Sequence, residues 1–485
     1  MTTPALSGKK LADLAFSNRL YKTAPFIFAK VKPEALTSPK IVHINQELLN
    51  RLELNPEQIT NPTFLRFING DLDFEGLFFG ASFYSGHQFG QYVPRLGDGR
   101  AIMLGEVETS DQHFYELQLK GSGLTPFSRM GDGKAVLRSS IREYLASAHL
   151  KALNIPTTEA LSLIRGEDDV YRETVEKSGV VLRVAESFLR FGHFQYYAHT
   201  NQLQELKTLV DFVVDHYFLN FKGHPNSHVL FYQEVVKRTA KLFARWQSVG
   251  FCHGVLNTDN LSILGLTLDY GPYGFIENFD QDYICNHSDH EGRYSLGNQP
   301  GIGMWNLEML GNALASLISE EDRKRTLDTY QQIFFVEYKR LLLEKCGLEK
   351  IQDSDDDFLR SLLNMLVVTK LDYTVFFRSL SRYESGSNKL QNIEVSKELS
   401  DWLSQYEFRL TREELPTDSR HKKMLAVNPK FILRNYVAQS TIENPSIIEK
   451  MFEVLTHPYE EWPEHNDWSG PAPENDRNLA VSCSS

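Results

Sequence analysis

Three polar residues in the middle of the chain have the types and the spacing of a metal–phosphate site. His253 and Asn260 stand seven positions apart, and Asp269 begins the tripeptide Asp-Tyr-Gly shortly after them. Carboxylate and amide oxygens are hard ligands that suit Mg²⁺ when phosphate oxygens complete its coordination. Asn260 and Asp269 are therefore interpreted as a metal-binding pair.

The same spacing occurs in the protein-kinase pattern H-R-D-x-x-x-x-N followed by D-F-G. One position departs from that pattern, because the place of the kinase base is taken by Val255. A carboxylate does stand beside the metal-binding Asn, as Asp259. The sequence therefore indicates either an inactive kinase-like protein or one that performs a different transfer.

Lys120 and Glu143 are placed to complete such a site from the preceding part of the chain. Lys120 ends a predicted strand, like the kinase lysine that contacts phosphates, and Glu143 lies on the next predicted helix like its ion-pair partner. The tetrapeptide Gly-Asp-Gly-Arg at 97–100 is either a phosphate-approach loop or an ordinary tight turn. Residues 131–134 are predicted to open a helix, whose N-terminus attracts anions.

Basic residues gather in this part of an acidic chain. The whole chain has 51 basic and 63 acidic residues, a net charge of −12, whereas positions 120–142 hold five cations and one acid, Asp132. Arg183 lies inside an apolar strand, where a charge needs a partner or a ligand. Arg190 follows that strand. The local excess predicts a polyphosphate pocket, with a solvated helix face as the alternative for the helical cations.

The elements that must position these residues differ between the two halves of the chain. Strand patterns occur at 101–106, 113–120 and 179–185, with a helix at 134–153. Beyond about residue 200 the patterns are helical, at 202–221, 231–249 and from 305 past 382. We therefore predict an α+β fold with two lobes, of the protein-kinase-like type.

Four segments follow from this pattern. They are an N-terminal extension at 1–75, a β-rich N-lobe with the nucleotide-phosphate site at 76–200, a helical C-lobe with the catalytic and metal loops at 201–385, and a C-terminal extension and tail at 386–485.

The composition excludes several classes of protein. Hydrophobic residues are 41% of the 485 positions and charged residues 24%, which is typical of a folded globular chain. The negative net charge disfavours non-specific binding to nucleic acid or to an anionic membrane. Four cysteines without C-x-x-C spacing predict neither a disulfide scaffold nor a zinc site. With no signal-peptide pattern and no long apolar run, we expect a soluble, cytoplasmic protein. We also expect it to be a monomer.

Five long and specific stretches, at 84–100, 119–123, 253–260, 268–272 and 285–290, carry a family resemblance. They resemble the selenoprotein O family, kinase-like proteins that act as protein adenylyltransferases, and the similarity spans nearly the whole chain. The resemblance implies that ATP lies in the cleft flipped relative to an active kinase, so that its α-phosphate faces the acceptor. AMP, or UMP if UTP is accepted, then passes to a Ser, Thr or Tyr hydroxyl of a protein, and pyrophosphate leaves.

The resemblance also assigns a role to individual residues. Asp259 is the proton acceptor, Asn260 and Asp269 bind Mg²⁺ or Mn²⁺, and Glu143 is the ion-pair partner of Lys120. The residues assigned to nucleotide binding are Gly97, Gly99, Arg100, Lys120, Asp132, Gly133, Arg183, Arg190 and Asp269.

Two cysteines enter through the same resemblance. The family often carries selenocysteine third from the C-terminus, where this chain has Cys483. The resemblance implies that Cys285 pairs with Cys483 and ties the tail to the metal-site region as a redox switch. Two free thiols are the alternative in a reducing cytosol.

Three functions stay open at the level of the sequence. They are protein AMPylation or UMPylation, an ordinary phosphotransferase with Asp259 as its base, and a nucleotide-binding pseudoenzyme that serves as a scaffold. Val255 argues against the second, and the intact pair of Asn260 and Asp269 argues against the third. The position of a label in ATP, α or γ, separates the first two.

Overall fold

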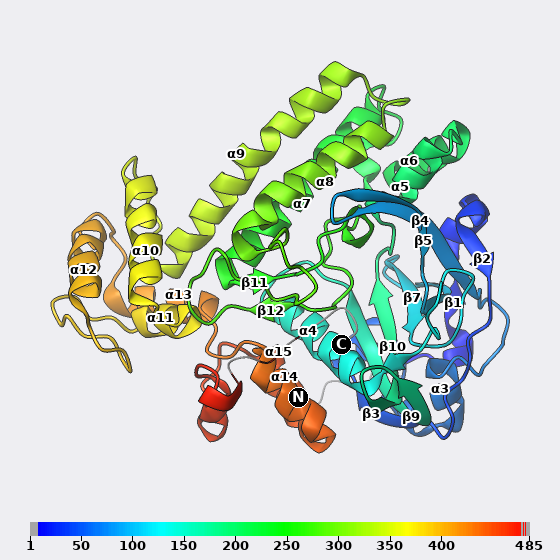
Figure 1. Ribbon diagram of the computed structural model, residues 1–485, viewed down its shortest axis with the longest axis horizontal. Coiled ribbons are helices and arrows are strands. Elements are labelled where there is room, and N and C mark those ends of the chain that lie inside the picture. The colour runs from blue at the N-terminus through cyan, green and yellow to red at the C-terminus, as the bar shows by residue number, and fades with distance from the viewer. Residues whose placement is uncertain (1–7, 477–478, 480, 482–485) are drawn as a thin grey trace.

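The computed structural model describes residues 8–476, 479 and 481, and its architecture is α+β (Figure 1). A large antiparallel sheet lies at one end of the molecule, and long helices extend away from it. In the described part of the chain, no helix is both long enough and apolar enough to span a bilayer.

The main path of the sheet follows the order β2-β4-β6-β7-β10-β9-β3, and β1, β5 and β8 pair at its sides with β6, β4 and β10. A separate pair, β11 and β12, lies in the loop region after the long helix α7. The strands are β1 (Ala15–Phe16), β2 (Phe28–Lys30), β3 (Lys40–Ile44), β4 (Gly80–Gln88), β5 (Gln91–Gly97), β6 (Ala101–Glu108), β7 (Phe114–Lys120), β8 (Ala135–Val136), β9 (Glu159–Tyr171), β10 (Val175–Ala185), β11 (Phe251–Cys252) and β12 (Gly274–Phe275).

The register of β7 and β10 sorts polar and apolar side chains onto opposite faces of the sheet. Arg183 lies directly opposite Gln118, which alternates along β7 with Leu117 and Leu119. Because successive side chains of a strand point to opposite faces, Gln118, Lys120 and Arg183 share one face. The two leucines pack into a hydrophobic cluster on the other face, so the predicted alternation over 113–120 is confirmed.

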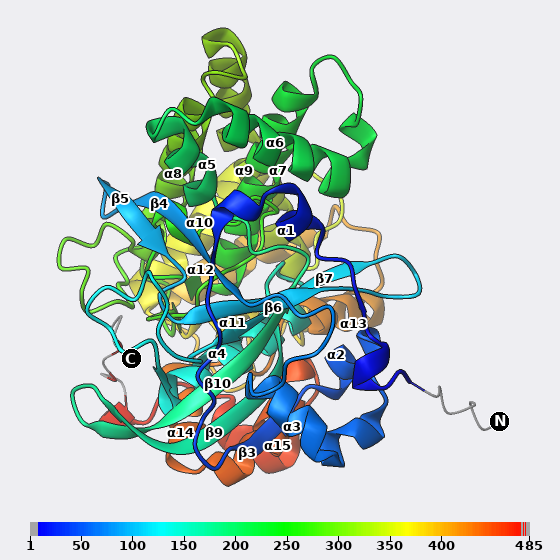
Figure 2. The same cartoon turned by 90° about the vertical axis from the view of Figure 1, so that its right-hand side faces the viewer.

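Helices cover both faces of the sheet. The helices are α1 (Arg19–Thr23), α2 (Gln46–Arg51), α3 (Pro62–Ile68), α4 (Leu137–Ala152), α5 (Phe191–His199), α6 (Leu203–Tyr217), α7 (Ser227–Val249), α8 (Gln299–Ala313), α9 (Glu320–Lys345), α10 (Asp355–Thr369), α11 (Tyr373–Leu380), α12 (Lys397–Leu410), α13 (Thr417–Val427), α14 (Asn435–Glu443) and α15 (Ile448–Thr456). The N-terminal helices α2 and α3 lie beside the sheet (Figure 2). Their leucines and phenylalanines belong to the same hydrophobic cluster as Leu117 and Leu119 of β7.

Helix α4 covers the polar face and begins later than the sequence predicts. The expected helix spans 134–153, but Ala135 and Val136 form β8, which pairs with Ser178 and Gly179 of β10. The glycine-rich stretch 131–134 therefore leads into a strand, and the prediction that it opens a helix is wrong. The competing factor is the backbone pairing with β10, which the local pattern does not reveal.

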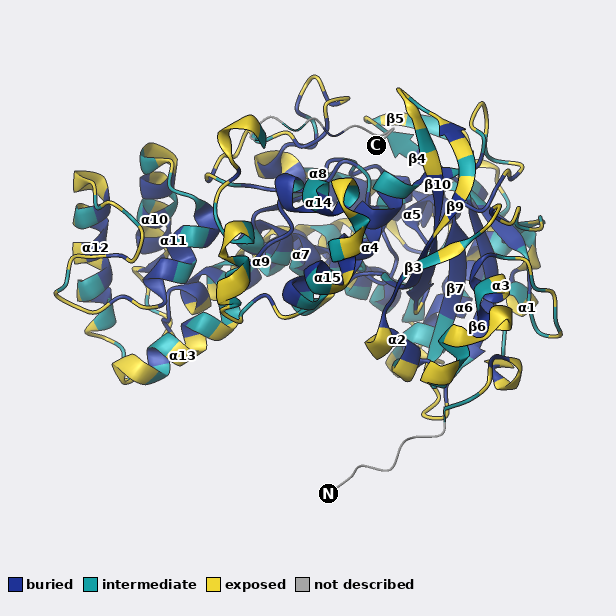
Figure 3. Cartoon of the chain, turned by 90° about the horizontal axis from the view of Figure 1, so that it is seen from below, coloured by how far each residue is buried: buried dark blue, intermediate teal, exposed yellow. Residues whose placement is uncertain are grey.

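The remaining helices follow the predicted order. The helix expected at 202–221 ends at Tyr217, and that expected at 231–249 begins at Ser227. Helices α10–α13 form a group remote from the sheet, with a core of their own against the end of α9 (Figure 3). The chain then returns, and α14 and α15 pack on α4 and near β3.

Three long strands are absent from the sequence prediction. Strands β4 and β5 lie in a stretch, 78–98, that is rich in glycine and aromatic residues, and the second half of β9 carries the charged run Gly-Glu-Asp-Asp. Neither stretch alternates cleanly, because these strands owe their extended state to pairing with neighbours along the sheet.

Candidate active site

A cavity of about 600 Å³ lies between the polar face of the sheet and the loop region that follows β11. Its walls are formed by the turn between β5 and β6, the end of β7, the loop before β8, strand β10 and the segment 255–272. The predicted residues that line it are Gly97, Gly99, Arg100, Lys120, Asp132, Gly133, Arg183, Arg190, Asn260 and Asp269. Glu143 and Asp259 lie behind its wall.

The cavity has a strong excess of positive charge. Seven basic side chains and three carboxylates are among its lining residues. The basic residues are Arg100, Lys120, Arg129, Lys134, Arg172, Arg183 and Arg190. Such a lining attracts polyanions, since guanidinium and ammonium groups form charge-assisted hydrogen bonds with phosphate oxygens.

Glu143 of α4 is shared by two cations at the back of the cavity. One carboxylate oxygen accepts from Lys120 Nζ and the other from Arg183 Nε, and all three side chains are buried. Burial acts to raise the pKa of Glu143, but Arg183 and Lys120 outweigh it and hold the value below normal. Burial also lowers the pKa of Lys120, to about 8. The predicted pairing of Lys120 with Glu143 is therefore present and includes Arg183.

Asp269 connects the loop region to Arg183 of β10 and to Arg190, the residue before α5. Its Oδ1 accepts from Arg183 Nη2 (3.0 Å), and its Oδ2 accepts from Arg190 Nη1. Its backbone has φ of 55°, in the left-handed region, which short polar side chains tolerate best after glycine. Burial opposes ionisation, but Arg190, Arg183 and Lys120 together hold the pKa of Asp269 well below normal.

His253 and Asn260 shape the loop between them. His253 Nε2 donates to the Leu268 carbonyl (2.8 Å), which ties the loop to the strand-like segment before Asp269. Asn260 Nδ2 donates to the Val255 carbonyl (3.0 Å), which commits its amide nitrogen and leaves its oxygen for the cavity. His253 therefore holds the loop in place through this bond.

Asp259 is buried against the hairpin of β4 and β5. Its Oδ2 accepts from Gln88 Nε2 (3.1 Å), and its backbone carbonyl accepts from Arg190 Nη1 (2.9 Å). Its Oδ1 has no hydrogen-bond partner among the described residues and faces Gly86, where an added Cβ would lie only 2.5 Å away. Burial raises the pKa of Asp259 to about 6, so the group is poised to exchange a proton near neutral pH.

The loops at the mouth of the cavity depend on glycine. Gly133 has φ of +70°, and a Cβ there would lie 2.1 Å from the carbonyl oxygen of Gly123. Asp132 is held by Arg172, whose two Nη atoms donate to its carboxylate (2.8 and 2.9 Å). The side chain of Asp132 therefore organises the loop, and Arg172 adds a cation to the lining.

Asn260 and Asp269 fit a divalent cation by their chemistry. Both line the cavity, and they offer an amide oxygen and an ionised carboxylate. Across the residues that the structure describes, no group of three or more His, Cys, Asp or Glu side chains could hold a metal by itself. A cation held by this pair would therefore complete its shell with water and phosphate oxygens, as Mg²⁺ commonly does.

Several residues of the site escaped the sequence prediction. Asp98 accepts from the backbone and hydroxyl of Ser82 and lies 3.8 Å from Arg190. Gln118 accepts from Arg183 Nη1 (3.1 Å). Gln118 lies two residues before Lys120 and therefore on the same face of the strand. The period-two pattern of β7 could thus have identified Gln118 as a residue of the site. Nothing in the local sequence signals the contact of Gln88 with Asp259, 171 positions apart.

Cys285 lies near the loop region and is buried. Its Sγ contacts the Cys252 carbonyl (3.4 Å), and burial raises the pKa of its thiol well above normal. Cys483, its predicted partner, lies outside the described residues. The nearby backbone amide of His287 donates to the carbonyl of Val481 (3.1 Å).

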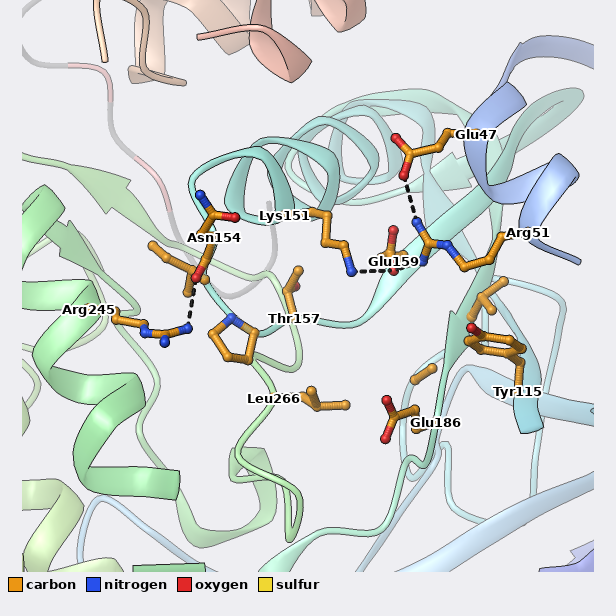
Figure 4. A pocket seen from close by; sticks show the side chains of 14 residues that line it. Glu47, Arg51, Tyr115, Lys151, Asn154, Thr157, Glu159, Glu186, Arg245 and Leu266 are labelled. Carbon is orange, nitrogen blue, oxygen red and sulfur yellow. Dashed lines mark hydrogen bonds and ion pairs between the residues drawn. The ribbon is translucent and has the colours of Figure 1, made fainter. Parts of the chain in front are cut away.

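A second cavity, of about 760 Å³, lies beside the end of α4 and has a different character (Figure 4). Arg51 pairs with Glu47 and Glu159, and Lys151 lies 3.4 Å from Glu159. Because its main cations are already matched by acids, this cavity suits a polyphosphate less well than the first. One wall residue, Thr157, contacts the hydroxyl of Tyr270, the residue after Asp269.

Comparison with known proteins places the chain in a family. The family model described as protein adenylyltransferase SelO matches residues 10–463. A protein nucleotidyltransferase YdiU of Myxococcus xanthus is 42% identical, with 98% of this chain and 99% of the relative covered. Similar proteins of the same name from Pseudomonas fluorescens and Yersinia pseudotuberculosis are 41% and 40% identical, over 98% and 97% of this chain and 100% and 99% of theirs. The chain therefore belongs to the SelO family of protein adenylyltransferases and is an enzyme of nucleotidyl transfer.

Proposed function

We propose that the enzyme transfers AMP from ATP, or UMP from UTP, to Ser, Thr or Tyr hydroxyls of protein substrates. The observation that carries this proposal is the cavity in which seven basic side chains accompany Asn260 and Asp269, with the Asp259 carboxylate behind one wall. A triphosphate with a divalent cation matches both the excess positive charge and the oxygen ligands. Membership of an adenylyltransferase family favours transfer of the nucleotidyl group over transfer of the γ-phosphoryl group.

The proposal includes the orientation of the nucleotide and the division of the chain. In it, residues 76–200 and 201–385 form the two lobes of a kinase-like fold, and 1–75 and 386–485 are extensions. ATP lies flipped relative to a kinase, with its α-phosphate towards the acceptor. The cluster of Lys120, Arg183 and Arg190 supports this orientation, because the outer phosphates then need cations deep in the sheet side of the cavity.

The chemistry is assigned to the side chains of this chain. Lys120, Arg183 and Arg190 hold the phosphates, and the loops at 97–100 and 132–133 enclose the nucleotide. Asp259 accepts the proton as the acceptor O–H bond breaks. A bond then forms between that oxygen and the α-phosphorus, the bond from the α-phosphorus to the bridging oxygen breaks, and pyrophosphate leaves with the electron pair.

Asn260 and Asp269 would hold Mg²⁺ or Mn²⁺ at this site. When bound, such a cation neutralises phosphate charge and polarises the phosphorus–oxygen bonds. Arg183 and Arg190 already orient the Asp269 carboxylate, so the ligand is fixed before the nucleotide arrives.

The test is the position of a label in ATP together with the Asp269→Ala variant. Wild-type chain is incubated with Mg-ATP or Mn-ATP, alone and with a dialysed lysate, and analysed by intact-protein mass spectrometry and by α- and γ-label transfer. We expect an added AMP mass, transfer from the α position only, and loss of both transfer and metal-dependent ATP binding in Asp269→Ala.

The opposite outcomes separate the competing functions. An added phosphate mass with γ-label transfer would establish a kinase. ATP binding without any transfer in every lysate tested would favour a scaffold. Unchanged Mg-ATP affinity in Asp269→Ala would contradict the assignment of Asp269 as a metal ligand.

Regulation and cellular setting form a separate part of the proposal. A disulfide between Cys285 and Cys483 would act as a redox switch, and the contact of His287 with Val481 supports a tail that runs close to Cys285. Tryptic maps that stay identical with and without reductant after mild oxidation would rule the disulfide out. The proposed setting is a cytoplasmic monomer without nucleic-acid or membrane partners.

A further inference from the structure

The hairpin of β4 and β5 is anchored by its backbone on the loop that carries Asp259. The amide of His87 donates to Thr258 Oγ1 (2.7 Å). The amide of Phe89, at the turn, donates to the hydroxyl of Tyr294 (2.8 Å) and to Asn257 Oδ1 (3.3 Å). Gln88 lies between these two anchored residues, so the backbone from which its side chain extends is held in place by bonds that do not involve that side chain.

Gln88 separates the carboxylate of Asp259 from the nucleotide cavity. Gln88 is one of the lining residues of that cavity and Asp259 is not. The carboxamide Nε2 of Gln88 donates to Oδ2 of Asp259 (3.1 Å). The other carboxylate oxygen, Oδ1, is buried and lies so close to Gly86 that a Cβ added there would be 2.5 Å from it. Oδ2 is the oxygen bonded to a residue of the cavity lining, so a group that approaches it past this lining meets the Gln88 carboxamide first.

Resting on the proposed function, we propose that Gln88 is a positioning residue that orients Asp259 and shields it from water until an acceptor hydroxyl takes its place. The carboxamide N–H and a hydroxyl O–H are equivalent donors to a carboxylate oxygen. An acceptor side chain entering from the cavity can thus exchange one hydrogen bond for another without leaving the carboxylate unpaired.

Water is the competitor that this arrangement excludes. A water molecule at Oδ2 would lose its proton to Asp259 and form a bond to the α-phosphorus. The bond to the bridging oxygen would break, and free AMP and pyrophosphate would leave. A protein acceptor gains binding energy from its other contacts with the enzyme and can use it to displace the Gln88 carboxamide from Asp259. A water molecule makes no such contacts and lacks this binding energy. Gln88 thereby favours transfer to an acceptor over hydrolysis.

The test compares Gln88→Met with Gln91→Met. Methionine keeps the length of glutamine but cannot donate a hydrogen bond. Gln91 is the cross-strand partner of Gln88 on the same hairpin and is exposed, so its variant controls for a glutamine-to-methionine change that does not touch Asp259. AMP release from α-labelled Mg-ATP is measured without acceptor, and label transfer is measured with heat-treated, dialysed lysate proteins.

For Gln88→Met, we expect AMP release to rise about fivefold and the ratio of transferred to released AMP to fall by at least as much, with KM for ATP within about twofold of wild type. Gln91→Met should match wild type in all three quantities. A merely structural role for Gln88 would instead raise KM for ATP and lower release and transfer together.

Two results overturn the inference, and they are distinguishable. If wild type transfers AMP but Gln88→Met keeps the wild-type ratio of transfer to release, the role of Gln88 is wrong and the proposed function stands. If wild type neither transfers nor releases AMP, with Mg²⁺ or Mn²⁺, the proposed function fails and the inference falls with it.

Discussion

Two carboxylates at the site, the buried Glu143 and the partly exposed Asp269, each accept from two cations. Glu143 accepts from Lys120 and Arg183, and Asp269 accepts from Arg183 and Arg190. Asp98, which lies 3.8 Å from Arg190, adds a third carboxylate, so Lys120, Arg183 and Arg190 are balanced by three acids in the free protein. The excess positive charge of the lining comes from the other four cations, which face one carboxylate, Asp132; they are Arg100, Arg129, Lys134 and Arg172. This excess is the part of the cavity that favours a polyphosphate ligand.

The isosteric change Asp259→Asn tests the proton acceptor. Asn keeps the size of the side chain but cannot take a proton, so AMP transfer should fall by about 10²–10⁴-fold. Because Asp259 does not line the cavity, ATP affinity should stay within about threefold of wild type. Single-turnover transfer from α-labelled ATP and calorimetric ATP binding measure the two quantities.

The contrasting outcome is also specific. If Asp259→Asn retained transfer within about tenfold of wild type, Asp259 would be a structural partner of Gln88 and not the base. A joint loss of ATP binding would instead show that the change disturbs Arg190, which donates to the backbone carbonyl of residue 259.

At the scale of elements, the loop before β8 depends on one glycine. Gly133 has φ of +70°, and its Cα faces the Gly123 carbonyl so closely that a Cβ would lie 2.1 Å from the oxygen. Gly133→Ala should therefore displace the loop, which lines the cavity. We expect ATP affinity to fall about tenfold and the free energy of unfolding to fall by about 1–3 kcal/mol, measured by calorimetry and chemical denaturation.

Gly223→Ala is the matched control for this change. Gly223 has almost the same backbone angle, φ of +73°, but an added Cβ meets nothing within 4 Å. The free energy of unfolding of Gly223→Ala should fall by only about 1 kcal/mol, the cost of placing alanine at this backbone angle, and its ATP affinity should equal that of wild type. Equal effects of the two variants on ATP affinity would contradict the role of the loop at 132–134 in enclosing the nucleotide.

Local pattern was sufficient where an element has a regular period or a fixed spacing. The alternation along 114–120 identifies the face of Lys120, and the interval from His253 to Asn260 identifies the loop that contacts Leu268, the residue before Asp269. Each of these signals lies within a short stretch of chain, so no tertiary information is needed to read it. The α+β class and the order of the main helices follow from the same kind of evidence.

Contacts between segments distant in the sequence determine the features that the sequence did not predict. Strand β4 is extended because it pairs with β2, β5 and β6, and its own residues carry little alternation. Gln88 reaches Asp259 only because β4 and β5 fold over the loop region. Residues 134–136, where the sequence predicts the start of a helix, are not helical for the same reason. Ala135 and Val136 form β8, which pairs with β10. Contacts between distant segments leave no local pattern.

At the scale of the whole molecule, one hydrophobic core joins the sheet to the helices. It includes Ile141 and Leu145 of α4, Phe231 and Trp246 of α7, and Met451 of α15. Helix α4 therefore carries Glu143 on the side of the site and receives the returning C-terminal helices on its other surfaces. The position of Glu143 is fixed by packing drawn from both ends of the chain.

Glu116 of β7 is a buried acid at the junction of the sheet with the helices. Its Oε2 accepts from the backbone amide of Phe188 (2.7 Å), in the connection from β10 to α5, and its Oε1 has no hydrogen-bond partner among the described residues. Burial and the nearby Glu106 raise the pKa of Glu116 from 4.5 to about 8. The carboxyl group is thus neutral in the folded protein at a pH where it ionises in the unfolded chain.

The change Glu116→Gln should therefore stabilise the protein in a pH-dependent way. Below pH 4.5 the carboxyl is protonated in both states, and variant and wild type should differ little. Between pH 4.5 and 8 only the unfolded state ionises, so the free energy of unfolding of the wild type falls as pH rises. Above pH 8 the loss is complete, at most about 5 kcal/mol. The advantage of Glu116→Gln in urea denaturation should thus be small at pH 5 and several kcal/mol at pH 8.

The exposed Glu173→Gln, at the turn from β9 to β10, should show no such trend. A constant difference between Glu116→Gln and wild type across this range would mean that Glu116 is ionised in the fold, and that its bond to Phe188 holds a charge at the junction of sheet and helices.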